Sequence, residues 1–218
     1  MDISKILSHT DHTLLSPTAT WHEIRELCDE AVTYGTASIC IPPCFVKPAK
    51  DYLGERMRVC TVIGFPNGYS SLRVKEYETG MALADGADEV DMVLSLGMVK
   101  EGDFRAVEEE IRFLRRAAEE KTLKVIVETC LLTREEKIRL CRVVGEAGAD
   151  YIKTSTGFSK GGATPEDVAL LAENVRPPLR IKAAGGILSL DDAWQFLSLG
   201  ADRLGSSRVV KLVKQMQD

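Results

Sequence analysis

The sequence predicts an α/β fold, a single TIM (β/α)8 barrel with a short extra N-terminal helix, and one domain over residues 1–218. Eight short apolar segments alternate with amphipathic helical segments, and the triplet Gly-Ala-Asp recurs at 86–88, 148–150 and 200–202. A chain of 218 residues with 44% apolar residues can bury one sizeable core. Strict alternation of strands and helices predicts a parallel sheet, and eight such units can close into a barrel.

Each Gly-Ala-Asp triplet follows a helical pattern and precedes an apolar strand. The glycine is expected to end the helix in a left-handed turn, so that the strand begins two or three residues later. The extra helix is predicted over Ile3–Leu7. The predicted strands are His12–Leu15, Ser38–Ile41, Val59–Ile63, Glu89–Leu94, Lys124–Glu128, Tyr151–Thr154, Arg180–Ala184 and Arg203–Gly205.

Helix starts between these strands are also marked in the sequence. Thr20 with Glu23 and Thr133 with Glu136 have the spacing of capping boxes, and Pro165 follows Thr164 at a first helical position. Apolar residues recur at helical spacing after each start, so each helix can cover one side of a sheet. The main alternative is an open doubly wound sheet, but the first predicted strand lacks the Gly-x-Gly-x-x-Gly fingerprint of that fold.

Composition excludes several classes of function. A net charge of -5 and a pI near 5.4 argue against nucleic acid or an anionic membrane as a partner. The first ten residues contain no apolar signal-peptide core, and no run approaches a membrane span, so we predict a cytoplasmic protein. The six cysteines form no Cys-x-x-Cys motif, and neither cysteines, histidines nor carboxylates are spaced as three metal ligands. We therefore predict reduced thiols, no metal site and no cofactor.

Two lysines lie inside predicted buried strands, Lys153 and Lys182, each near the end where the strand gives way to a glycine-containing loop. Desolvation lowers the pKa of a lysine, and a second nearby ammonium lowers it further. Such a pair can keep one amine neutral and nucleophilic, which favours Schiff-base chemistry.

Side chains alternate along a strand, so Lys153, Lys182 and Asp91 are all expected to point into the barrel. Barrel enzymes build their sites at the C-terminal ends of the strands, where these side chains would meet. A single strand lysine more often reaches solvent or forms a buried ion pair. Two lysines and an aspartate that all face the same side of their strands favour a functional site.

Glycine and serine after the sixth, seventh and eighth strands predict a phosphate site. Barrels often bind phosphate at the loops after strands seven and eight, where glycine lets the backbone approach the anion. Gly161-Gly162 fits a turn as well as a ligand, and Asp11 is left open as a site residue near the mouth of the barrel. Cys40 is expected to be a small buried hydrophobe. The predicted phosphate residues are Gly157, Gly185, Gly186, Gly205, Ser206 and Ser207.

Several motifs together resemble the deoxyribose-phosphate aldolase family: Tyr151-Ile-Lys-Thr-Ser-Thr-Gly157, Lys182-Ala-Ala-Gly-Gly186, Glu89-Val-Asp-Met92, Ser38-Ile-Cys-Ile-Pro42 and Asp11-His-Thr-Leu14. The resemblance implies a metal-free class I aldolase of deoxyribonucleotide catabolism. Such an enzyme reversibly cleaves 2-deoxy-D-ribose 5-phosphate to D-glyceraldehyde 3-phosphate and acetaldehyde, and the family commonly forms homo-oligomers.

The resemblance also implies roles for individual residues. Lys153 matches the Schiff-base lysine, Lys182 the lysine that perturbs its pKa, and Asp91 the acid/base aspartate. Phosphate positions fall at Gly185, Gly186, Gly205 and Ser207, with Gly157 and Ser206 beside them. The family often has Phe-Gly-Thr-Gly-Gly where this chain has Phe158-Ser-Lys-Gly-Gly162, so substrate preference is left open.

Two alternatives are kept. Another Schiff-base aldolase or a transaldolase-like enzyme would also form a covalent adduct but would prefer another donor, which acetaldehyde exchange distinguishes. A non-catalytic phosphosugar-binding barrel would bind without turnover or adduct formation.

Overall fold

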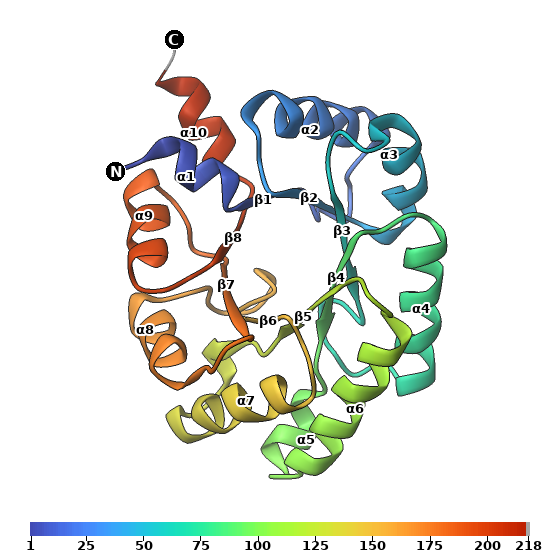
Figure 1. Ribbon diagram of the computed structural model, residues 1–218, viewed down its shortest axis with the longest axis vertical. Coiled ribbons are helices and arrows are strands. Elements are labelled where there is room, and N and C mark those ends of the chain that lie inside the picture. Colours follow the sequence, from blue (N-terminus) through green and yellow to red (C-terminus); the bar gives the residue numbers. More distant parts are fainter. Residues whose placement is uncertain (217–218) are drawn as a thin grey trace.

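The computed structural model describes residues 1–216 and contains a closed barrel of parallel strands in the order β1 to β8. Figure 1 shows the strands at the centre and the helices around them. The predicted fold class is therefore confirmed. The strands are β1 (Thr10–Thr13), β2 (Ser38–Ile41), β3 (Val59–Ile63), β4 (Glu89–Val93), β5 (Thr122–Ile126), β6 (Tyr151–Lys153), β7 (Arg180–Ala184) and β8 (Arg203–Ser206).

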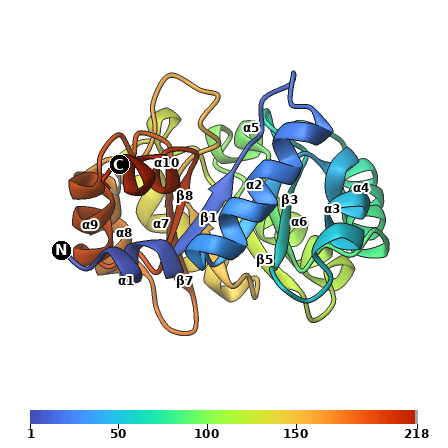
Figure 2. The ribbon, with the colours of Figure 1, turned by 90° about the horizontal axis from the view of Figure 1, so that it is seen from above.

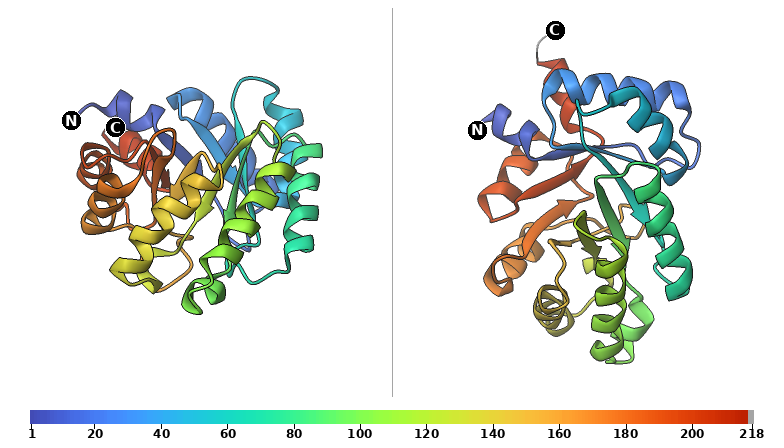
Figure 3. Two further views of the ribbon diagram at one scale, coloured as in Figure 1. Left: turned by 60° about the horizontal axis from the view of Figure 1, so that its bottom comes forward. Right: turned by 45° about the vertical axis from the view of Figure 1, so that its right-hand side comes forward.

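One or more helices follow each strand, and the view from above in Figure 2 shows α2 crossing the outside of β1. The extra N-terminal helix α1 is present and packs against α9 and α10, so the two ends of the described chain lie on one side of the barrel (Figure 3). The α-helices are α1 (Ile3–Ser8), α2 (Trp21–Tyr34), α3 (Val46–Leu53), α4 (Leu72–Ala84), α5 (Leu96–Lys100), α6 (Phe104–Ala117), α7 (Arg134–Glu146), α8 (Pro165–Asn174), α9 (Leu190–Ser198) and α10 (Val209–Gln215), and the 3₁₀ helices are η1 (Pro43–Phe45) and η2 (Thr129–Leu131).

The predicted helix boundaries depend on local hydrogen bonds that the structure confirms. Thr20 and Thr133 each form a complete capping box, with Glu23 and Glu136 respectively. Each glycine of the three Gly-Ala-Asp triplets has a positive φ, 99° at Gly86, 84° at Gly148 and 109° at Gly200. Left-handed glycine after each of these helices turns the chain back toward the barrel.

The main apolar core lies between the strands and the helices. Val90, Met92, Ile152 and Ile181 point outward into this core and are almost fully buried. Their neighbours along each strand point inward, as the alternation predicts. The barrel interior is largely polar, with a small apolar cluster around Cys40, Cys60 and Val62. No helix within residues 1–216 has the length and apolar character needed to cross a membrane.

Two strands begin earlier than predicted. β1 begins at Thr10 because Thr10 pairs with Leu204, and β5 begins at Thr122 because Thr122 pairs with Glu89. β5 also ends earlier than predicted, since Glu128 has a φ of 53°. Asp11 therefore lies within a strand and is fully buried, so its expected position near the barrel mouth is wrong.

Candidate active site

Asp91 of β4 lies at the centre of the predicted catalytic residues. Its Oδ2 atom accepts hydrogen bonds from Lys153 Nζ at 2.7 Å and from Lys182 Nζ at 2.8 Å. Lys153 is the last residue of β6 and Lys182 the third of β7, and the two are directly paired in the sheet. The structure thus brings together the three side chains that strand parity selected.

Sequence reasoning missed a third lysine. Lys124 of β5 is fully buried, and its Nζ lies 2.7 Å from Asp91 Oδ1 and 2.6 Å from Glu89 Oε2. The available signal was the same one that selected Lys153: Lys124 stands between the apolar residues Leu123 and Val125 in a buried strand.

Asp11 contributes a third buried carboxylate to the barrel interior, beside Asp91 and Glu89. It accepts hydrogen bonds from Lys182 and from Ser38 Oγ, the latter at 2.7 Å, and it pairs with Arg203 at 2.5 Å. His12 points the opposite way, to Glu30 at 2.8 Å, so it takes no part in these contacts. The interior charge cluster comprises Asp11, Glu89, Asp91, Lys124, Lys153, Lys182 and Arg203.

Charge pairing inside the cluster overcomes the effect of burial on its pKa values. Burial raises the pKa of Asp91, but the ammonium groups of Lys124, Lys153 and Lys182 hold that pKa well below its usual range. Burial likewise raises the pKa of Asp11, and Lys182, Lys124 and Arg203 lower it further than burial raises it. Both carboxylates are therefore ionised at neutral pH.

Two of the buried lysines are held as ammonium ions. Burial lowers the pKa of Lys182, but Asp11 and Asp91 raise it above its usual value. For Lys124, burial also lowers the pKa, and Asp91, Cys60 and Glu89 raise it well above its usual range. Lys182 is thus a fixed positive charge beside Lys153.

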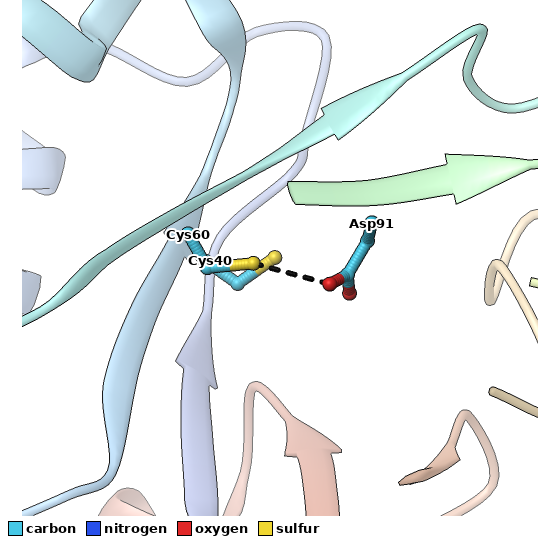
Figure 4. A group of neighbouring side chains, drawn as sticks. All are labelled: Cys40, Cys60 and Asp91. Carbon is cyan, nitrogen blue, oxygen red and sulfur yellow. Dashed lines mark hydrogen bonds between the residues drawn. The ribbon is translucent and has the colours of Figure 1, made fainter. Parts of the chain in front are cut away.

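Metal-ligating side chains converge in the interior, so the expectation that no three of them would do so is wrong. Ligand atoms of Cys40, Cys60 and Asp91 lie within 4.8 Å of one another (Figure 4), and those of Asp11, Cys60 and Glu89 form a second such group. They come from different strands, which linear spacing does not reveal. Lys124 Nζ lies 3.3 Å from Cys60 Sγ and contacts both Asp91 and Glu89. The Lys124 ammonium therefore already pairs with a carboxylate in each of the two sets of possible metal ligands.

The thiols at this point have different environments. A hydrogen bond from Cys60 lowers the pKa of Cys40 against the effect of burial, whereas burial and the hydrogen bond to Cys40 raise the pKa of Cys60. Cys40 is fully buried, as expected of a small hydrophobe, and all six cysteines are free.

A cavity of about 380 Å³ opens above the charge cluster at the C-terminal ends of the strands. Lys153 lines it, whereas Lys124 and Lys182 are fully buried beneath. All of the predicted phosphate residues line the same cavity: Gly157, Gly185, Gly186, Gly205, Ser206 and Ser207. A larger hollow of about 950 Å³ lies outside the barrel along α7 and residues 174–178, and no residue of the charge cluster lines it.

Glycine is required at these positions for more than one reason. Gly157 has a φ of 84° and open space where a side chain would begin, so its backbone can approach a ligand. A Cβ at Gly205 would lie 3.1 Å from Lys182 Cε and 2.9 Å from Ala184 Cβ. Gly205 therefore also leaves room for Lys182. A Cβ at Gly162 would lie 2.4 Å from the carbonyl carbon of Gly185, which gives this glycine a packing role.

The two predicted serines differ. Ser206 is buried, and its Oγ accepts hydrogen bonds from the backbone N–H groups of Arg208 at 3.0 Å and Val209 at 3.3 Å. Those two N–H groups at the start of α10 are thus already satisfied. Ser207 is exposed at the cavity, so its hydroxyl is the freer of the two.

Comparison with known proteins identifies similar chains. A family model described as DeoC/LacD family aldolase matches residues 5–202. A deoxyribose-phosphate aldolase of Streptococcus agalactiae is 55% identical over 217 residues, which is 100% of this chain and 97% of that protein. One of Streptococcus pyogenes is 56% identical over 98% of this chain and 96% of its own length.

Solved structures agree with the sequence relatives. A Coccidioides immitis protein whose provisional name is deoxyribose-phosphate aldolase has a TM-score of 0.95 and 40% identity, covering 100% of this chain and 88% of its own. The tetrameric deoxyribose phosphate aldolase of Aeropyrum pernix has a TM-score of 0.89 and 33% identity, covering 100% of this chain and 93% of its own.

Proposed function

The chain belongs to the DeoC/LacD family of aldolases, and on that basis we propose that it is a deoxyribose-phosphate aldolase. It reversibly cleaves 2-deoxy-D-ribose 5-phosphate to D-glyceraldehyde 3-phosphate and acetaldehyde through a Schiff base on Lys153. The observation that carries the proposal is the position of Lys153, which lines the cavity while its Nζ contacts Asp91.

The pattern of ion pairs supports Lys153 as the nucleophile. Within residues 1–216, the interior charge cluster holds four basic side chains and three carboxylates. Lys124, Lys182 and Arg203 each contact at least two of the carboxylates, whereas Lys153 contacts Asp91 alone in the described cluster. Lys153 is thus the basic side chain of the cluster that is held by the fewest ion pairs, and it is also the one that lines the cavity.

The chemistry follows from these groups. Neutral Lys153 attacks the C1 aldehyde of the open-chain sugar, and loss of water gives an iminium ion. The iminium nitrogen accepts the electron pair of the C2–C3 bond as the C3 hydroxyl loses its proton and C3 becomes the carbonyl carbon of the leaving aldehyde. This step releases D-glyceraldehyde 3-phosphate and leaves an enamine. Protonation of the enamine and hydrolysis release acetaldehyde and restore Lys153.

Asp91 and Lys182 are proposed to move the protons in these steps, through water where the substrate lies beyond direct contact. Asp91 is ionised and touches Lys153, so it can accept a proton beside the nucleophile. Lys182 remains an ammonium ion and shares the same carboxylate oxygen. The two form a proton relay that ends at the reacting amine.

The phosphate is proposed to bind at the other side of the cavity. Gly185 and Gly186 both have a φ of 75°, a conformation that favours glycine. Both residues line the cavity, so their backbone forms part of its wall. Ser207 adds an exposed hydroxyl, and Gly157, Gly205 and Ser206 complete the wall. Metal-free chemistry, a cytoplasmic location, a homo-oligomer and the absence of a nucleic-acid partner remain predictions.

The proposal is tested by adding 2-deoxy-D-ribose 5-phosphate and following D-glyceraldehyde 3-phosphate with a coupled dehydrogenase. Turnover that persists after exhaustive chelation is expected. A transaldolase-like enzyme would fail to incorporate labelled acetaldehyde into the pentose phosphate. A non-catalytic barrel would bind the sugar phosphate without turnover, and either result would contradict the proposal.

A further inference from the structure

Glu128 has an unusual backbone for a buried side chain. Within residues 1–216, Glu119 and Glu128 are the non-glycine residues with positive φ, at 50° and 53°. Glu119 is exposed in the turn before β5, whereas Glu128 is 2% exposed and follows β5 at the catalytic end of the barrel. A positive φ is unfavourable for a residue with a Cβ atom, so the surrounding contacts must hold Glu128 in this conformation.

Most of those contacts lead to one residue on the next loop, and the Cys130 thiol also donates to Oε1 of Glu128 at 4.0 Å. The two carboxylate oxygens of Glu128 each lie 3.3 Å from the backbone nitrogen of Thr156, and Oε2 also accepts a hydrogen bond from the Thr156 hydroxyl. The hydroxyl oxygen of Thr156 in turn accepts a hydrogen bond from Phe158 N at 3.0 Å. Glu128 thereby fixes both ends of the Thr156–Phe158 turn through one threonine.

This turn forms part of the cavity wall. Thr156, Gly157 and Phe158 line the cavity, and the Phe158 ring packs edge-on against Phe65, with ring centroids 5.2 Å apart. Phe158 is half exposed, so packing alone does not fix its position. The carboxylate of Glu128 provides the buried polar anchor of the turn.

The same loop continues to the proposed phosphate glycines. Ala163 N donates to the carbonyl oxygens of Ala184 and Gly185, both at 3.1 Å. The Gly162 Cα lies 3.1 Å from the position of a Cβ on Gly185. Residues 156–163 are thus held by Glu128 at one end and packed against Gly185 at the other.

From this geometry we infer that Glu128 is a positioning residue for phosphosugar binding, acting through Thr156 on the loop of residues 156–163. It does not touch the reacting atoms. The inference rests on the proposed function, because it assigns the phosphate of the substrate to the wall that this loop supports. Loss of the carboxylate is expected to weaken substrate binding more than it slows the bond-breaking step.

Glu128→Gly and Glu119→Gly form a matched pair for the test. Each substitution relieves a positive φ, but only the first removes a carboxylate that holds the cavity wall. We expect Glu128→Gly to raise KM for 2-deoxy-D-ribose 5-phosphate by about tenfold or more, as for loss of a hydrogen bond to a charged group, with kcat within about threefold. Glu119→Gly should leave both constants within about twofold.

Glu128→Gln provides a version that keeps the shape of the side chain. Its amide oxygen still accepts one hydrogen bond from Thr156, so its KM should fall between those of the parent protein and Glu128→Gly. This variant also decides the question if Glu128→Gly fails to fold. A KM for Glu128→Gln equal to that of the parent would then overturn the inference.

Two further measurements separate this inference from the proposed function. Borohydride trapping of acetaldehyde on Lys153 tests the aldolase chemistry and should be retained in Glu128→Gly. Binding of inorganic phosphate, measured by calorimetry, tests the cavity wall in the absence of catalysis. The phosphate affinity should weaken by about tenfold in Glu128→Gly. Unchanged phosphate affinity, or a loss of kcat and thermal stability with unchanged KM, would overturn the role of Glu128 even if the parent is an active aldolase.

Discussion

Lys153 and Lys182 share a single oxygen atom, Oδ2 of Asp91, at 2.7 and 2.8 Å. One of these lysines lines the cavity and the other is fully buried as an ammonium ion. The shared oxygen therefore connects the amine that can reach substrate to a fixed positive charge.

Asp91→Asn should lower kcat by about 10²- to 10⁴-fold, the range for loss of a group that transfers protons. Asparagine has nearly the same shape but cannot accept a proton at neutral pH, and its amide nitrogen cannot accept hydrogen bonds from the lysines. Steady-state cleavage kinetics and a thermal melt check the result. A folded variant with more than a tenth of the parent kcat would exclude Asp91 as the acid/base group.

Lys124→Met should destabilise the protein by about 3–5 kcal/mol, because it removes a buried ammonium group that pairs with both Glu89 and Asp91. Lys124→Met combined with Glu89→Gln should recover part of this loss, since the double variant removes one of the two carboxylates that Lys124 contacts most closely. Urea denaturation of both variants provides the measurement. If the second substitution adds a further loss of its own, Lys124 does not act through these ion pairs.

Stability should be greatest between about pH 5 and pH 9 and fall outside this range. Asp11 and Asp91 have folded pKa values below the unfolded value of 3.8, so the stability they contribute is present above pH 3.8 and is lost as the pH falls through the folded values. Lys124 and Lys182 have folded pKa values above 10.5, so their contribution is complete below pH 10.5 and is lost as the pH rises through the folded values. Urea denaturation midpoints, measured within this pH range and on both sides of it, test the prediction. Asp91→Asn should weaken the dependence of stability on pH at acid pH. An unchanged dependence in that variant would count against the contribution of Asp91.

Ser207→Asp should lower kcat/KM for 2-deoxy-D-ribose 5-phosphate by about a hundredfold or more, about 3 kcal/mol, because like charges repel in a partly desolvated cavity. Phosphate binding lies away from the reacting carbons, so cleavage of unphosphorylated 2-deoxyribose should change little. Parallel kinetics on the two substrates make the comparison. Equal losses on both would place phosphate binding elsewhere, with Ser159-Lys160 as the next candidate.

The sequence predicted the features that depend on local periodicity. Strand parity placed Lys153, Lys182 and Asp91 in the interior, and capping boxes placed the starts of α2 and α7. Glycine and serine after the last strands predicted the residues that line the cavity.

What the sequence did not reveal depends on contacts between distant strands. Lys124 has the same parity as the predicted lysines, but its importance comes from Glu89 and Asp91 one strand away. Asp11 appeared to lie near the mouth because the start of β1 depends on its pairing with β8. The convergence of Cys40, Cys60 and Asp91 from three strands likewise requires the closed barrel.

The most direct test of the account is reductive trapping of the Schiff base. The protein is treated with acetaldehyde and borohydride, digested, and mapped by mass spectrometry, with Lys153→Arg and the exposed-loop variant Lys160→Arg in parallel. Arginine keeps a positive charge but offers no neutral amine at accessible pH. The account predicts a stable two-carbon adduct on Lys153 in the parent protein and in Lys160→Arg, and none at residue 153 in the inactive Lys153→Arg variant. An adduct confined to other lysines, or turnover that survives Lys153→Arg, would contradict it.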